Sequence, residues 1–171
     1  LVEAGSGRNV FSDEQGLPTD TFHHFIGGLQ ACMADFTALF APNVNSYQRL
    51  CHPYASPNNA CWSEDNRAAG LRIPASAPAA RRVENRLPGA DANPYLAIAA
   101  SLAAGLHGIE QRLQPSPAIQ GEFEVPEHLS LPCTLHAALE RLKRSALARE
   151  LFGSEFIEGY IASKTLELTD F

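Results

Sequence analysis

Most of the positively charged residues in the first two thirds of this 171-residue chain gather in one stretch, and no lysine precedes Lys143. Between residues 49 and 86, six arginines accompany three acids, in a chain whose net charge is −6. A planar guanidinium binds two oxygens of a carboxylate or phosphate at once, so the cluster indicates anion binding. An arginine-rich composition without a ligand is the alternative, and residue types alone favour neither interpretation. The six are Arg49, Arg67, Arg72, Arg81, Arg82 and Arg86.

Four short motifs lie between Asn45 and Leu96, and three of them contain most of these arginines. They are Asn-Ser-Tyr-x-Arg, Asn-Arg-x-x-x-x-Arg-Ile-Pro, Arg-x-Glu-x-Arg and Gly-Ala-Asp-Ala-Asn-Pro-Tyr-Leu. In this order and spacing, the chain resembles the carboxy-terminal, substrate-binding part of the glutamine synthetase catalytic domain, from about Gly7 to Phe171. The last motif is most similar to the branch that glutamylates amines, the γ-glutamylpolyamine (γ-glutamylputrescine) synthetases.

The resemblance implies an ATP-dependent ligase that makes γ-glutamyl phosphate from glutamate, which an amine then attacks. It implies catalytic, substrate-binding roles for Arg49, on the glutamate carboxylate, and for Arg86, at the glutamate or acyl-phosphate end. Three more arginines would bind ATP, since phosphoryl transfer needs cations where charge develops on the transferring oxygens. These three are Arg67, Arg72 and Arg82.

The resemblance also implies that Glu84 is a metal ligand, because carboxylate oxygens suit Mg²⁺ or Mn²⁺. Without the family pattern, Arg82, Glu84 and Arg86 would be a surface ion-pair ladder worth under about 1 kcal/mol. The family's amino-terminal β-grasp domain and the upstream strands that carry most metal-binding carboxylates have no counterpart in residues 1–171, which we expect to form a single domain. We therefore expect Glu84 alone not to hold a catalytic metal, and the chain alone to be inactive.

One position departs from the glutamine synthetases that use ammonia. Those enzymes carry a glutamate in a Gly-Tyr-Glu-Ala-Pro-like loop, and the matching run here, Pro53 to Pro57, has Ala55 at the acidic position. A methyl group neither accepts a proton nor attracts ammonium, which favours a larger amine as the substrate. The alternatives are a true glutamine synthetase and a non-catalytic module of the same family, and the retained arginines argue against the latter.

The helices and strands that must position these residues are predicted to form an α+β fold, which is mostly helical and has a short antiparallel β element. Apolar residues recur at three and four positions from about Thr19 to Phe40, which predicts a helix, and its Gly27-Gly28 pair predicts a close packing contact. In residues 41–66 the apolar residues do not recur at a regular spacing, so this segment is expected to be irregular. Residues 68–73 and 81–87 are predicted to be strands.

Arg67 is expected in the loop before the first strand, because two residues five apart in one strand face opposite ways. Asn93-Pro94 predicts a helix start, followed by a leucine-containing stripe to about Leu113 and tight packing through alanines. Two shorter helices are predicted at 135–145 and at about 155–168, after a proline-rich loop.

Amino-acid composition restricts the class of protein and the cellular compartment that we expect. At 45% hydrophobic and 19% charged residues the chain is globular, and the acidic balance argues against nucleic-acid binding. No apolar run reaches the roughly 20 residues that span a bilayer, and no signal peptide is recognisable, so we expect no membrane partner and a cytoplasmic location. The four cysteines are expected to be reduced, with a Cys51–Cys61 disulfide as the second possibility. Family members form double-ringed oligomers, whereas this chain alone is expected to be a monomer or small oligomer.

Overall fold

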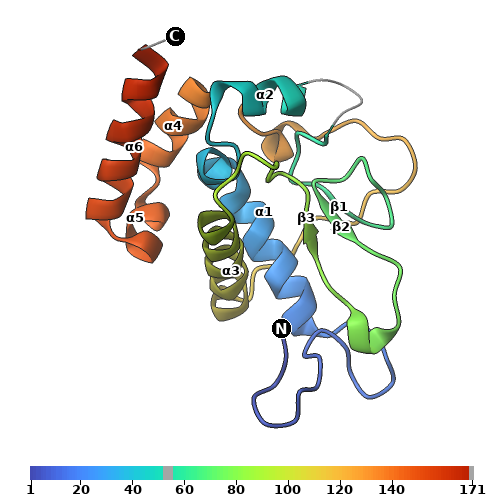
Figure 1. Cartoon of the computed structure of the whole chain (residues 1–171). Helices are drawn as coiled ribbons and strands as arrows, with labels where there is room; N and C mark the ends of the chain where they lie inside the picture. The colour runs from blue at the N-terminus through green and yellow to red at the C-terminus, as the bar shows by residue number, and fades with distance from the viewer. Residues whose placement is uncertain (52–55, 170–171) are drawn as a thin grey trace.

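Six α-helices and a small three-stranded sheet make up the computed structural model over its described residues, 1–51 and 56–169 (Figure 1). Helix α1 (Asp20–Phe40) runs through the middle of the molecule, with α3 (Pro94–Gln111) along one side and the strands on the other. The core gathers around α1, where Phe36 and Ile26 are fully buried. The α+β, mostly helical class is confirmed.

Helix α1 begins where the sequence predicts. The Thr19 side chain accepts a hydrogen bond from the backbone N–H of Phe22, which satisfies one of the free donors of the first turn. One face of the helix meets the sheet, where the rings of Phe22 and Trp62 lie 6.4 Å apart and edge to face. The sheet therefore packs against α1, and most of the arginine motifs lie in the strands or next to them.

Small residues join α1 to α3. A Cβ atom added to Gly28 would lie 2.6 Å from the Gly108 Cα atom and closer still to the Ala104 carbonyl oxygen, so the two backbones touch. The close contact predicted for the glycine pair is confirmed. The buried face of α3 is made of alanine and glycine, whereas Leu102 and Leu106 of the expected leucine stripe are 40% and 47% exposed. The backbones are too close here for leucine to be the packing residue.

The sheet is mixed, with the order β1-β2-β3. Strand β1 (Trp62–Glu64) pairs in parallel with β2 (Leu71–Ile73), and β2 pairs antiparallel with β3 (Glu84–Asn85). The predicted antiparallel pair is thus confirmed, although both strands are shorter than expected.

The prediction that residues 41–66 are irregular is wrong in two places. Helix α2 (Val44–Cys51) and strand β1 both lie in this range. Helix α2 buries only Ser46, Tyr47 and Leu50, so its short apolar face is too small to give a clear period. Strand β1 has three residues, which is too short for alternation to be visible.

The carboxy-terminal part holds three helices instead of the two predicted. They are α4 (Leu135–Arg144), α5 (Ala146–Phe152) and α6 (Ser154–Thr169). Ser145 ends α4 and caps α5 by accepting from the Ala148 N–H, so one serine replaces a loop between the two helices. No described helix has both the length and the apolar character needed to cross a membrane.

Candidate functional site

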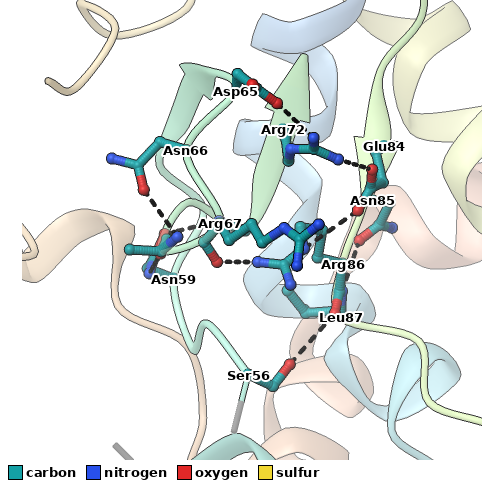
Figure 2. A network of polar contacts seen from close by, with 12 residues as sticks. Ser56, Asn59, Asp65, Asn66, Arg67, Arg72, Glu84, Asn85, Arg86 and Leu87 are labelled. Atoms are coloured by element: carbon teal, nitrogen blue, oxygen red, sulfur yellow. Dashed lines mark hydrogen bonds and ion pairs between the residues drawn. The ribbon is translucent and has the colours of Figure 1, made fainter. Parts of the chain in front are cut away.

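Arg72, in the middle of β2, lies between two carboxylates (Figure 2). Its Nη1 is 2.8 Å from Glu84 Oε2, across the β2–β3 ladder, and its Nη2 contacts Asp65 Oδ1 just after β1. The hydrogen bond to Asp65, followed by that to Glu84, raises the pKa of Arg72 although burial opposes the charged form. The guanidinium is thus held charged and in a fixed orientation.

Arg86 lies just beyond β3 and shares Glu84 with Arg72. Its Nε is 3.2 Å from Glu84 Oε1, so both oxygens of this carboxylate are occupied by arginines. A second nitrogen, Nη1, donates to the backbone carbonyl of Arg67. The pairing between strands therefore brings three of the predicted arginines, Arg67, Arg72 and Arg86, to one side of the molecule (Figure 2).

Arg67 lies in a turn before β2, as predicted, and its side chain is exposed. Asn59 holds this turn: its Nδ2 donates to the Ala68 carbonyl at 3.0 Å and its Oδ1 accepts from the Gly70 N–H at 3.0 Å. Arg67 and Arg86 then line a cavity of about 960 Å³. Such a volume lies in the range of small-molecule and cofactor sites.

Arg49 approaches from helix α2. Its Nη1 donates to Ser56 Oγ at 2.6 Å and its Nη2 donates to the Leu87 carbonyl, directly after Arg86 in the chain. Its Nε is buried without a hydrogen-bond partner among the described residues. Arg49 therefore lies against the segment that carries Arg86, and only some of its five N–H donors are used by these contacts.

The surroundings of Arg49 include a second charged group. Burial disfavours the Asp91 carboxylate, but hydrogen bonds from Ser46, its own backbone N–H and Asn43, together with the charge of Arg49, outweigh this and lower the Asp91 pKa. Asp91 thus stays ionised and joins the start of α2 to the segment before α3.

Two of the six arginines lie apart from this cluster. Arg82 is exposed, and its Nη1 donates to the Ala80 carbonyl at 3.2 Å, with no ion pair to an acid in the part of the chain that the structure describes. Arg81 instead donates to Ser12 Oγ at 2.8 Å and to the Phe11 carbonyl at 3.2 Å. Arg81 fixes the amino-terminal loop, and the structure places it outside the site.

The described residues around Glu84 do not provide a complete set of ligands for a divalent metal. Within residues 1–51 and 56–169, no three histidine, cysteine or acidic side chains lie close enough together to hold an ion. Both oxygens of Glu84 already contact arginines. The described residues therefore offer a metal at most one carboxylate at this site.

Sequence reasoning missed the residues that hold the arginines in place, chiefly Asp65, Asn59 and Ser56. Asp65 has a φ of 46°, a left-handed conformation that aspartate tolerates better than most residues. This conformation turns the chain out of β1 and directs the carboxylate towards Arg72. The only sequence signal was an Asp-Asn pair, typical of a turn, seven residues before an arginine.

Comparison with known proteins agrees with this architecture. The family model for the glutamine synthetase catalytic domain matches residues 1–171. The chain is 39% identical over 165 residues to the gamma-glutamylethanolamide synthetase GlnA4 of Streptomyces coelicolor, covering 96% of this chain and 35% of the relative. It is 39% identical to the glutamate–isopropylamine ligase of a Pseudomonas species (95% and 37% covered).

A glutamine synthetase of Thermus thermophilus is also 39% identical, with 96% of this chain and 39% of the relative covered. The chain thus spans little more than a third of the length of the curated relatives it matches. The family contains ligases for both amines and ammonia. The chain belongs to the glutamine synthetase family and matches its catalytic domain.

Proposed function

We propose that this chain is the carboxy-terminal part of an ATP-dependent ligase that joins glutamate to an amine through γ-glutamyl phosphate. The observation that carries the proposal is the arginine cluster, in which Arg72 and Arg86 share Glu84 while Arg86 and Arg67 line one cavity. Because the chain spans little more than a third of its relatives, other parts of the enzyme would complete the site.

Arg49 and Arg86 would bind glutamate. Arg49 has a buried Nε without a partner among the described residues, and it contacts the backbone next to Arg86. Two arginines that meet at this segment suit a substrate with a carboxylate at each end. In the reaction, Arg86 would stabilise the charge that develops on the acyl-phosphate oxygens.

Arg67 and Arg72 would bind ATP phosphates, and Arg82, which lies outside the cluster, would line the more distant nucleotide site. When Mg²⁺ or Mn²⁺ is bound, it would offset phosphate charge, with Glu84 as one ligand and further ligands from the rest of the enzyme. In the free chain, Glu84 forms ion pairs with both Arg72 and Arg86. Phosphate would replace Glu84 as the partner of these arginines, and the Glu84 carboxylate would then be free to bind the cation.

An amine is the proposed acceptor because of Ala55, which lies outside the described residues. The sequence places this methyl group where ammonia-using enzymes carry a glutamate. Two relatives are named for amine substrates, but an equally similar relative is a glutamine synthetase, so similarity alone does not choose between them. The second candidate is therefore a true glutamine synthetase that uses ammonia.

The test of the ligase activity is ADP release by an enzyme of family length that contains this chain. With ATP and Mg²⁺, release should require both glutamate and an acceptor, either of which alone should give only background. Amines to compare are ethanolamine, isopropylamine, putrescine and spermidine, beside ammonium. A non-catalytic module would release no ADP with any of them.

In that enzyme, Asp65→Asn should lower kcat about tenfold while lowering, rather than raising, the KM for ATP. Arg72 would lose one of the two carboxylates that orient it, which affects the transition state. The removed negative charge would meanwhile strengthen ground-state attraction of phosphate. Steady-state kinetics at saturating glutamate and amine measure both constants.

Glu64→Gln is the matched control, since Glu64 precedes Asp65, is exposed and makes no ion pair among the described residues. It removes the same charge without touching Arg72, and its kcat should stay within about twofold of the parent value. Equal kcat losses in the two variants would show that charge alone, and not the orientation of Arg72, is at work.

A further inference from the structure

Two exposed cysteines, 82 positions apart in sequence, lie against each other beside the arginine cavity. Cys51 is the last residue of α2, and Cys133 directly precedes Thr134, which caps α4. The Cys51 thiol donates to the Cys133 backbone carbonyl at 3.3 Å. The other two cysteines, Cys32 and Cys61, are buried.

The surroundings of the two thiols differ. Burial, followed by a hydrogen bond with the Cys133 thiol, raises the pKa of Cys51 to about 11, so Cys51 stays protonated at neutral pH. Cys133 has a different environment, because Asn58 Nδ2 donates to its Sγ at 3.1 Å. The amide donor at its sulfur makes Cys133 the thiol that reacts first with a peroxide.

We infer that Cys51 and Cys133 form an oxidation site, which a peroxide converts into a disulfide between the end of α2 and the start of α4. The inference rests on the placement of two exposed thiols and on the Asn58 contact. It does not depend on the proposed ligase activity. The Cys51–Cys61 disulfide, the second possibility from the sequence, plays no part in it, because Cys61 is buried.

The chemistry balances with hydrogen peroxide as the oxidant. The Cys133 thiolate attacks one peroxide oxygen, the O–O bond breaks, and a sulfenic acid and hydroxide form. The Cys51 sulfur then attacks the sulfenic sulfur, and its thiol proton leaves with the hydroxyl group as water. The hydroxide takes up the proton first lost from Cys133. Two thiols and one peroxide therefore give one disulfide and two waters.

The bond would change the wall of the cavity. Leu50 and Asn58 both line it, and each is next to the pair: Leu50 precedes Cys51, and Asn58 donates to Cys133. Oxidation would change the sulfur that Asn58 Nδ2 contacts, while the contact of the same nitrogen with the Leu131 carbonyl, at 3.4 Å, would remain. It would also fix the helix that carries Arg49.

The test uses this chain, treated with hydrogen peroxide, alkylated and digested for mass spectrometry. A peptide linking Cys51 to Cys133 should form, while Cys32 and Cys61 become alkylated only after unfolding. Because the bond closes a long loop, the melting temperature should rise by about 5–10 °C, and a reducing agent should reverse the rise.

Cys51→Ser and Cys133→Ser should each abolish the linked peptide and the rise in melting temperature. Asn58→Ala should slow disulfide formation several-fold without preventing it, which tests the role of the amide donor at Cys133. The inference is wrong if Cys133 goes on to sulfinic acid while Cys51 remains alkylatable. It is equally wrong if both thiols of the folded chain survive peroxide and are alkylated.

Discussion

Gly28→Ala should lower the free energy of unfolding of this chain by about 3 kcal/mol, one of the two largest effects that we predict. The added methyl group would meet the Gly108 Cα atom at 2.6 Å and the Ala104 carbonyl oxygen more closely. Both are backbone atoms, so no side-chain rotation relieves the clash, and α1 and α3 must separate. This cost exceeds the roughly 1 kcal/mol that alanine gains over glycine within a helix.

Urea unfolding followed by circular dichroism measures this change. Gly159→Ala is the matched control, because Gly159 lies in α6 and an added Cβ there meets nothing within 4 Å. The control should be stabilised by up to about 1 kcal/mol, since only the helix propensity changes. If Gly28→Ala were as stable as Gly159→Ala, the backbone contact between α1 and α3 would be refuted.

Arg86→Lys should lower kcat/KM of the ligase that contains this chain by about 10²–10³-fold. Arg86 uses Nε to contact Glu84 and Nη1 to hold the Arg67 carbonyl, which leaves further N–H groups for a substrate oxygen. A lysine keeps the charge but has a single nitrogen, so it cannot make these contacts together. Both kcat and kcat/KM should therefore fall.

Initial rates over a range of glutamate concentrations provide this comparison. Arg144→Lys is the control, because the Arg144 side chain on α4 is 81% exposed and, among residues 1–51 and 56–169, forms an ion pair with Glu140 alone, at 3.3 Å. Exposed pairs of this kind contribute little, and the control should keep its activity. Parent-like kinetics in Arg86→Lys would remove Arg86 from the proposed chemistry and leave it a surface residue.

The long helices were predictable because local rules determine them. The spacing of apolar residues predicts α1, and Asn93 accepts from the N–H groups of Tyr95 and Leu96 as its type predicts. Even the contact at Gly28 follows from sequence, since a glycine inside a helix needs a packing reason. Such features depend on residues only a few positions apart.

Short elements and the supports of the site were not predictable in this way. Helix α2 and strand β1 owe their existence to tertiary contacts, as when Trp62 Nε1 donates to the Ser116 carbonyl, 54 positions away. The sequence motifs identified the arginines as candidates. Only the fold shows that Asp65 forms an ion pair with Arg72 and that Arg82 lies apart from the other site arginines. Which acid meets which arginine depends on strand register, and sequence spacing does not define it.

The central claim is that this chain belongs to a ligase that prefers amines to ammonia, and a competition assay tests it most directly. The family-length enzyme would receive ATP, Mg²⁺, glutamate and equal concentrations of isotope-labelled ammonium, ethanolamine, isopropylamine and putrescine. Mass spectrometry of the products then gives the ratio of kcat/KM values in one vessel. We predict that a γ-glutamylamide of one amine exceeds labelled glutamine. Labelled glutamine as the main product would contradict the amine assignment, and no γ-glutamyl product at all would contradict the ligase itself.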